Sequence, residues 1–178
     1  MESLGGDFQI YENSGYRNER QKKQTLVIDL QGSSDLTPTT GDATLRRTTF
    51  TVDLQEPFII DSLCDVYLDN FTTLNAIANT AAAINTAFVV DIDQFQIKTN
   101  TNNAELLHKL VIPNEDNSVA ATATLKVHKG KKMNYVCQMN PQTLTQLSGS
   151  VTAMNGTTME SGTGDYRVIM ECVFVSRE

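Results

Sequence analysis

Apolar and polar side chains alternate with a period of two along most of the chain after residue 24. Successive side chains of a β-strand point to opposite faces, so this pattern is typical of strands with one buried face. Three early segments show this alternation. In each of them, three apolar residues occupy every second position: Leu26, Ile28 and Leu30; Phe50, Val52 and Leu54; and Cys64, Val66 and Leu68. Because proline cannot donate a hydrogen bond into a ladder, we expect Glu56 and Pro57 to close the second strand.

The alternation changes phase once, between residues 88 and 97. Phe88, Val90 and Ile92 share one parity, and the next apolar residues, Phe95 and Ile97, share the other. One extra residue near Asp93 and Gln94 would restore the phase. The pattern therefore predicts a β-bulge or a bend at that point.

Residues 74–87, LNAIANTAAAINTA, interrupt the strand pattern. Their apolar residues have helical spacing, but Asn and Thr are poor helix formers. A short helix and an ordered apolar loop are both compatible with this segment. In either form it is a long insertion between two strands, and such insertions often carry contacts with partners.

Three strands are expected between residues 106 and 139. Residues 106–112 place Leu106, His108, Leu110 and Ile112 on one parity and end at the turn Pro113-Asn114. Residues 121–127 and 133–139 alternate on either side of the lysine-rich stretch HKGKK. Two alternating runs separated by a short glycine-containing link predict a β-hairpin. In the second of these runs, Met133, Tyr135, Cys137 and Met139 share one parity.

The last two strands differ in character. Leu147, Gly149 and Val151 indicate a weaker strand, which ends at Asn155-Gly156, a favoured two-residue hairpin turn. Residues 166–175 are apolar on both parities. A strand that is apolar on both sides is usually central or covered.

Taken together, these segments predict an all-β fold, a two-sheet antiparallel sandwich. We expect a single jelly roll of about eight strands, because several connections are too long for simple hairpins and favour Greek-key wiring. An immunoglobulin-like sandwich is the second choice, since the chain has no Trp and no paired-cysteine framework. Residues 1–24, rich in glycine and polar residues, are expected to form an N-terminal arm, and residues 25–178 to form one domain.

Composition and charge limit the classes of molecule that the chain is expected to bind. The 178 residues carry a net charge of −7, which argues against general affinity for nucleic acid, since such binding needs many cations to neutralise phosphates. No apolar run reaches the roughly 20 residues that span a bilayer, and the N-terminus lacks the pattern of a signal peptide. The cysteines, Cys64, Cys137 and Cys172, are expected to be buried free thiols, which suits a reducing compartment.

Candidate chemistry is sparse. The two histidines, His108 and His128, have no second ligand at a familiar metal-site spacing, so we interpret them as ordinary strand or surface residues. Asp91 and Asp93 form one acidic face, and Asp61, Asp65 and Asp69 another; a cation site would require these faces to meet. The sequence has no nucleophile elbow, phosphate-binding loop or dinucleotide fingerprint. We therefore expect neither an enzyme nor a cofactor.

Two basic clusters are the candidate interaction residues. One comprises Lys126, Lys129, Lys131 and Lys132 around the expected hairpin tip, and the other Arg17 and Arg20 at the end of the arm. The lysine cluster suits an acidic neighbour, including another copy of this acidic chain. The alternative is a hairpin tip that serves only solubility.

Several stretches resemble the small single-jelly-roll capsid proteins of large icosahedral DNA viruses. They are DVYLDNFTTLN at 65–75, AFVVDIDQFQIKT at 87–99, LVIPNE at 110–115, KGKKMNYVCQMNP at 129–141 and LSGSVTAMNG at 147–156, followed by a terminal strand ending in VFVSRE. The resemblance is one of sequence style and covers most of the chain after residue 60. It implies no individual functional residue.

The resemblance implies a capsid role, as the penton subunit at five-fold vertices or as a minor protein that cements larger capsomers. The expected partners are then other copies of this chain, as a pentamer, and other capsid proteins, in a virion assembled in the host cytoplasm. A lectin-like module that binds host glycan is the alternative binding function. Surface aromatic residues beside Asp91, Asp93 or the 72–87 insertion would favour it.

Overall fold

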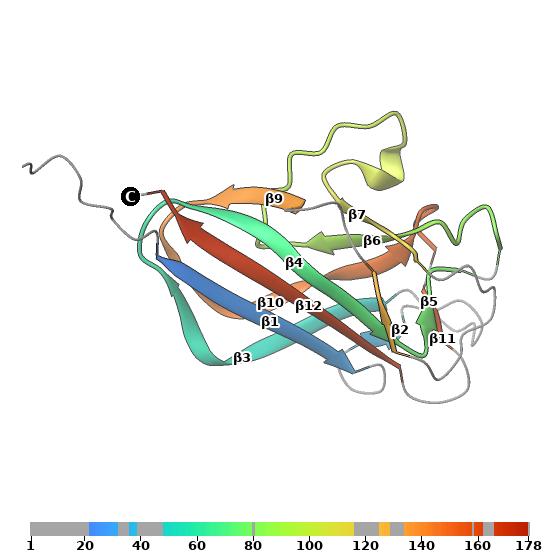
Figure 1. Ribbon diagram of the computed structural model, residues 1–178, viewed down its shortest axis with the longest axis horizontal. Helices are drawn as coiled ribbons and strands as arrows, with labels where there is room; N and C mark the ends of the chain where they lie inside the picture. The colour runs from blue at the N-terminus through green and yellow to red at the C-terminus, as the bar shows by residue number, and fades with distance from the viewer. Residues whose placement is uncertain are drawn as a thin grey trace, which may run out of the picture.

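The structure, a computed structural model, describes residues 22–31, 36–38, 48–79, 81–115, 125–128, 134–157, 159–161 and 166–177. It is built from antiparallel strands in two five-stranded sheets (Figure 1). The first sheet has the order β1-β12-β4, with both β8 and β9 on the far side of β4: β1 (Lys23–Gln31), β12 (Arg167–Ser176), β4 (Cys64–Leu74), β8 (Leu125–Val127) and β9 (Asn134–Met139). The all-β, two-sheet antiparallel prediction is confirmed.

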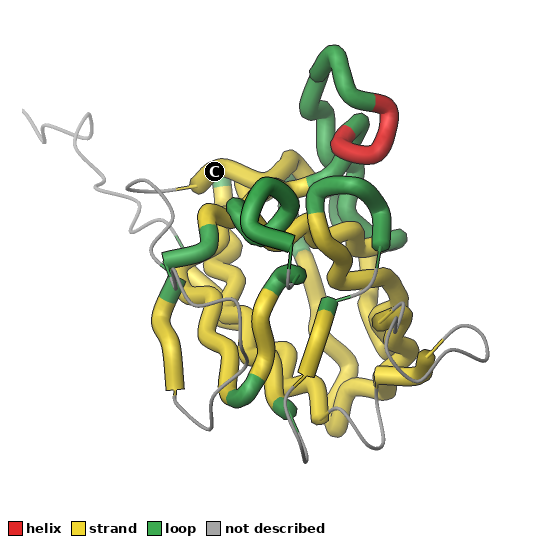
Figure 2. The backbone as a smooth tube through the Cα atoms, turned by 90° about the vertical axis from the view of Figure 1, so that its right-hand side faces the viewer, coloured by secondary structure: helices red, strands yellow, loops and turns green. Residues whose placement is uncertain are grey.

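The second sheet has the order β2-β3-β10-β6-β7. Its strands are β2 (Leu36–Pro38), β3 (Thr48–Ile60), β10 (Gln142–Ala153), β6 (Ala87–Ile92) and β7 (Leu110–Pro113). A small two-stranded sheet pairs β11 (Glu160–Ser161) with β5 (Ala76–Ile77), and a single 3-10 turn, η1 (Ala104–Leu106), lies in the segment between β6 and β7. That segment projects beyond the body of the two sheets (Figure 2).

The core lies between the two large sheets. Phe71 of β4 packs against Phe88 of β6 with ring centroids 5.3 Å apart, and Phe58 of β3 packs against Phe174 of β12 at 4.8 Å. Fully burying a ring such as that of Phe71 or Phe88 stabilises the fold by about 1.5–3 kcal/mol, and the partly buried Phe58 contributes less. These cross-sheet contacts explain why the core-facing parity of the long strands is apolar.

The alternation predicted the long strands of the first sheet correctly. Leu26, Ile28 and Leu30 are buried in β1, and Cys64, Val66 and Leu68 in β4. The last strand, β12, is central, as its two apolar faces predicted, because it pairs with β1 on one side and β4 on the other. Its neighbours cover both edges of its backbone.

The prediction that Glu56 and Pro57 end the second strand is wrong. β3 continues to Ile60, and Ile59 and Ile60 pair with Thr143 and Gln142 of β10. The register between β3 and β10 shifts between Leu144, which pairs with Phe58, and Gln146, which pairs with Asp53. Pro57 therefore lies in an irregularity where the ladder is interrupted, and such a position tolerates a residue without an N–H.

The phase change near Asp93 is a bend, one of the two outcomes predicted. β6 ends at Ile92, and the amide of Phe95 donates to the Ile92 carbonyl at 2.9 Å. The amide of Asp93 donates to the carbonyl of Ser148 in β10, also at 2.9 Å. The turn returns Phe95 and Ile97 to the core with the opposite parity.

The 74–87 segment is an ordered loop in its described residues, so the helical alternative is wrong there. β4 extends to Leu74, β5 follows, and residues 81–86 form turns. Asn side chains tie the loop together: Asn79 accepts from the amide of Ala81 at 2.8 Å, and Asn85 accepts from the Asn114 side chain at 2.7 Å. Side-chain bonds of this kind offer the backbone an alternative to the helix.

The strand expected over 106–112 is shorter than predicted. Only Leu110–Pro113 form β7, which ends at Pro113 as expected. Asn103 caps η1 by accepting from the amide of Glu105, and His108 adopts a positive φ of 59°. A positive φ is incompatible with a strand. Leu106 and His108 share the parity of Leu110 and Ile112, but they do not belong to the strand.

The hairpin expected between residues 121 and 139 is wrong. β8 and β9 do not pair with each other; both pair antiparallel with the same edge of β4, β8 with Thr72–Leu74 and β9 with Cys64–Leu68. They therefore run in the same direction, end to end, as one interrupted edge strand. Residues 121–124 and 129–133 lie outside the described residues.

The turn at Asn155-Gly156 is confirmed, but it does not link two paired strands. β10 ends at Ala153, whose amide donates to the carbonyl of Thr157 at 2.8 Å. Gly156 has a φ of 73°, which favours glycine. The next strand, β11, pairs with β5 rather than with β10, because the chain leaves the second sheet here.

Candidate interaction groove beside β9

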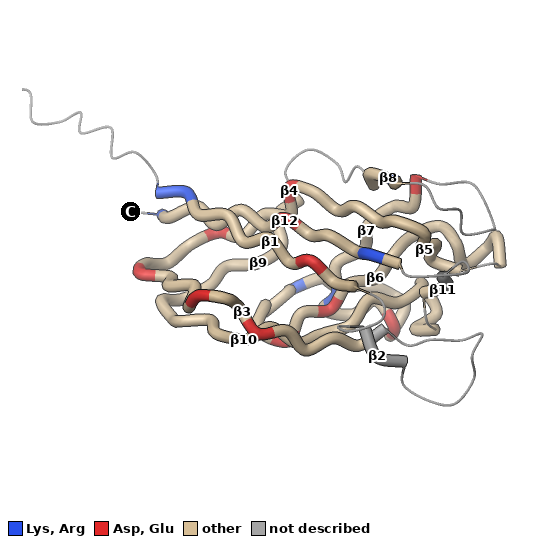
Figure 3. Tube along the Cα trace, turned by 90° about the horizontal axis from the view of Figure 1, so that it is seen from below, with Lys and Arg blue, Asp and Glu red and all other residues tan. Residues whose placement is uncertain are grey.

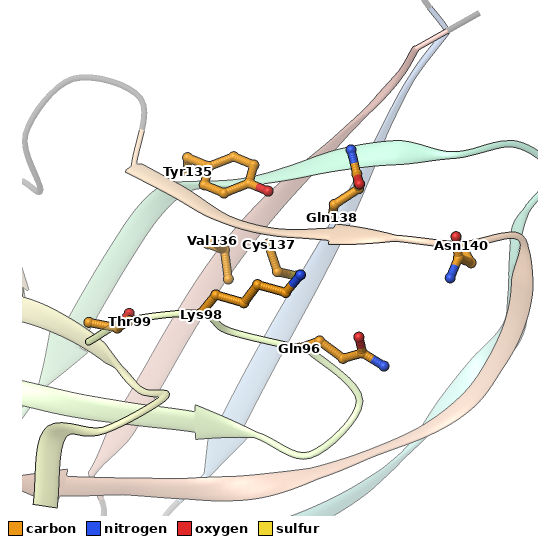
Figure 4. A pocket seen from close by; sticks show the side chains of 8 residues that line it. All are labelled: Gln96, Lys98, Thr99, Tyr135, Val136, Cys137, Gln138 and Asn140. Carbon is orange, nitrogen blue, oxygen red and sulfur yellow. The ribbon is translucent and has the colours of Figure 1, made fainter. Parts of the chain in front are cut away.

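A groove lies between β9 and the segment that follows β6. It has a volume of about 290 Å³, and its walls carry mainly amide, hydroxyl and amine groups (Figure 4). The residues that line this β9 groove are Gln96, Lys98 and Thr99 on one wall, and Tyr135, Val136, Cys137, Gln138 and Asn140 on the other. A second cavity of about 170 Å³ shares Gln96, Gln138 and Asn140 and extends toward Gln142.

A β-bulge in β9 decides which side chains reach the groove. Val66 pairs with Cys137 and Tyr67 pairs with Tyr135, so Val136 has no partner residue on β4. A bulge of this kind reverses the parity of the residues that precede it. Consequently Cys137 is buried, whereas Tyr135 is 53 % exposed.

The prediction that Tyr135 shares the face of Cys137 and Met139 is therefore wrong. Tyr135 lies on the outer face of the first sheet, where its ring meets that of Tyr67 edge-on with centroids 5.9 Å apart. Edge-to-face aromatic pairs stabilise by about 0.5–1.5 kcal/mol beyond their buried area. The pair holds one wall of the groove in place.

Charged groups secure the end of β9. Arg177 donates from Nε to Asp65 Oδ2 at 2.8 Å. The same guanidinium donates at 3.1 Å to Gln138, whose amide oxygen is oriented toward Arg177. The other carboxylate oxygen, Asp65 Oδ1, is buried and has no hydrogen-bond partner within the described part of the chain. The ion pair raises the pKa of Arg177, so the guanidinium stays charged.

Burial suppresses the reactivity of the thiol in the groove wall. Burial raises the pKa of Cys137 to about 12, and a bond from the Gln96 backbone opposes this only in part. Because the thiolate is the reactive form, a thiol with such a pKa is inert near neutral pH. The prediction that the cysteines are buried and unpaired is confirmed for Cys64, Cys137 and Cys172.

The acidic residues singled out in the sequence do not converge. Asp91 and Asp93 belong to β6 and the turn after it, in the second sheet, whereas Asp65 and Asp69 lie on β4 of the first. Acidic positions are spread over the strands of both sheets (Figure 3). Within the described ranges, no three side chains of His, Cys, Asp and Glu lie close enough to hold a metal ion.

His128 is a core residue rather than a strand or surface residue. It is 2 % exposed and packs against Phe71 and Phe88 at centroid distances of 5.8 and 4.8 Å. Its Nδ1 accepts from the amide of Glu115 at 3.2 Å, so Nε2 carries the proton and donates to Thr73 Oγ1 at 2.8 Å. The ring thus joins β4 to the residues that follow β7. His108 is exposed, as a surface residue would be.

Of the predicted basic clusters, the structure places Lys126 alone. It lies in β8, is partly buried, and pairs with Thr73 in the ladder. Lys129, Lys131, Lys132, Arg17 and Arg20 lie outside the described residues. The groove residues escaped the sequence analysis, because glutamines and a tyrosine in an alternating pattern give no signal of a site.

No family model matches the chain, and the comparison with curated proteins gave no match. Among the residues described, no helix is long and apolar enough to cross a membrane.

Proposed function

We propose that the two sheets form a single jelly roll. The proposal is supported by the strand order, once β8 and β9 are counted as one interrupted strand and the short β2, β5 and β11 are set aside. Eight strands remain, and in chain order the first sheet reads 1-8-3-6 and the second 2-7-4-5. Two interlocked Greek keys, folded into facing four-stranded sheets, have this wiring.

On this fold we propose a structural capsid subunit of a large icosahedral DNA virus, without enzymatic activity, at the five-fold vertices. The single observation that carries the proposal is the strand order, which accords with the fold implied by the sequence resemblance. A shell subunit needs a packed core, and the cross-sheet contacts between Phe71 and Phe88 and between Phe58 and Phe174 contribute to one.

A five-fold position requires a heterologous interface, in which one edge of the subunit meets a different edge of the next. The first sheet has two dissimilar edges that suit this requirement. β1 borders one side as a regular nine-residue strand, and the interrupted β8 and β9 border the other. A minor capsid protein that cements larger capsomers is the competing position in the shell, and the symmetry of the assembled protein separates the two.

Native mass spectrometry and electron microscopy of the purified full chain test the function. Five-membered rings, alone or at the vertices of particles, are the expected result. A species that stays monomeric at high concentration and never joins particles would contradict the capsid role. Assemblies with other symmetry that bind between capsomers would contradict the vertex position and favour the cementing role.

A further inference from the structure

The free edge of β9 is the strongest unassigned feature of the described chain. β9 pairs with β4 on one side, and on its other side it makes no backbone–backbone hydrogen bond to any described residue. Alternate residues of a strand direct their N–H and C=O groups to each edge, so the six-residue β9 presents about three such residues outward. An edge of this kind is a template for another strand.

The β9 groove lies along this edge and offers polar partners for an extended segment. Gln96 and Lys98 face β9 from the opposite wall (Figure 4). Amide side chains both donate and accept, so Gln96 and Asn140 can bond to the peptide groups of an incoming backbone. The amide oxygen of Gln138 accepts from Arg177, which leaves its NH₂ group as a donor. Lys98 adds one cation to the wall, which favours an acidic segment.

The chain itself contains a segment of matching chemistry. In DFQIYE, residues 7–12, Phe8 and Ile10 alternate with Gln9 and Tyr11, and aromatic and β-branched residues favour strands. Asp7 and Glu12 flank this run, and no Lys or Arg precedes Arg17. This segment lies outside the described residues and is complementary in charge to Lys98.

Its point of attachment lies at the opposite edge of the same sheet. Lys23 pairs with Val175, Val175 with Asp65, and Asp65 with Gln138, so the start of β1 and the groove share one row across the sheet. Three strand spacings of about 4.8 Å separate them within one copy. The ten residues between Glu12 and Lys23 span up to about 35 Å when extended.

From these observations we infer that residues 7–12 of one copy add as a strand to β9 of a neighbouring copy. The choice of a second copy rests on the proposed function. In the ring proposed above, with the β1 edge of one subunit set against the β8–β9 edge of the next, the segment lies beside the neighbour's groove rather than its own. Strand addition supplies affinity through main-chain bonds and specificity through the groove side chains.

Crosslinking between two differently labelled full-length chains tests the inference. One chain carries Ile10→Cys with an affinity tag, and the other carries Gln138→Cys without a tag; the two are mixed during assembly and treated with a short bis-maleimide. The native cysteines do not compete, because all three are buried. A covalent heterodimer of tagged and untagged chains is expected. The matched control replaces Gln138→Cys by Thr51→Cys, at an exposed position on β3 of the second sheet, and should give at least tenfold less heterodimer.

The outcomes separate the two proposals. If rings form but the Ile10→Cys and Gln138→Cys chains crosslink no better than the control, the inference is overturned and the ring-forming function stands. If a single chain carrying both substitutions crosslinks only within itself, the segment docks on its own copy and the inference is likewise overturned. If the unmodified protein stays monomeric, the proposed function fails first, independently of the crosslinks.

Discussion

Gly149 of β10 lies so close to the backbone carbonyl of Asp91 in β6 that a side chain at this position would force the two strands to shift. A Cβ at Gly149 would lie 2.0 Å from the carbonyl oxygen of Asp91 and 3.0 Å from the ring of Phe50. The first contact is with backbone, which cannot swing aside as a side chain does. The close approach of β10 and β6 therefore favours glycine at this position.

Gly149→Ala is expected to destabilise the protein by about 1–3 kcal/mol, the cost of forcing an extra methyl group into a packed sheet. Chemical denaturation of the purified variant measures the effect. Ser150→Ala, at the next position of β10, is the control and should change stability by less than about 1 kcal/mol. Equal effects of the two substitutions would contradict the close approach.

His128→Ala is expected to lower the free energy of unfolding by about 2–4 kcal/mol. The substitution removes a buried ring that packs against Phe71 and Phe88. It also removes the hydrogen bonds that the ring makes with Thr73 Oγ1 and with the amide of Glu115. Thermal or urea unfolding measures the loss. His108→Asn, at an exposed position whose positive φ asparagine tolerates, should cost less than about 1 kcal/mol; a similar loss there would count against a core role specific to His128.

Asp91→Asn is expected to stabilise the protein at pH 7, but not at pH 3. Burial raises the pKa of Asp91; Lys109 lowers it in part, and Asp93 raises it further. Because the folded-state pKa lies above the unfolded value, the unfolded chain releases its proton first as pH rises. Stability contributed by the neutral carboxyl group is therefore present below the unfolded pKa and falls as pH rises through the folded one.

Urea unfolding of wild type and Asp91→Asn at both pH values checks this sign. The gain of the variant should appear at pH 7 and vanish at pH 3, where the wild-type carboxyl group is also neutral. Asp69→Asn, on the exposed face of β4, is the matched control and should show a difference below about 0.5 kcal/mol at pH 7. A variant less stable than wild type at pH 7 would refute the prediction.

The three thiols are expected to resist alkylation in the folded protein at pH 8 and to react fully in denaturant. Burial raises the pKa of Cys137 and of Cys172 to about 12, and also raises the pKa of Cys64. The thiolate needed for the reaction is then scarce in the folded state. Intact mass after treatment with iodoacetamide counts the modified thiols, and rapid labelling of any of them without denaturant would contradict their burial.

Local pattern was sufficient to predict which residues of β1, of β12 and of the first half of β4 are buried. In those stretches the side chains alternate regularly, and a residue's parity alone decides whether it meets the opposite sheet. The buried thiols followed from the same alternation. So did the bend at Asp93, because a change of phase has to be accommodated by the backbone wherever it occurs.

Only the tertiary structure decided the pairing of strands and the groove they create. β8 and β9 look like the two arms of a hairpin, yet both pair with β4, and the bulge at Val136 turns Tyr135 outward beside Tyr67. Pro57 stays within β3 because its partner strand is out of register there. Alternation of apolar and polar residues indicates which face of a strand is buried. The partner of a strand and its register depend on contacts between residues far apart in the chain, and a local pattern does not determine those contacts.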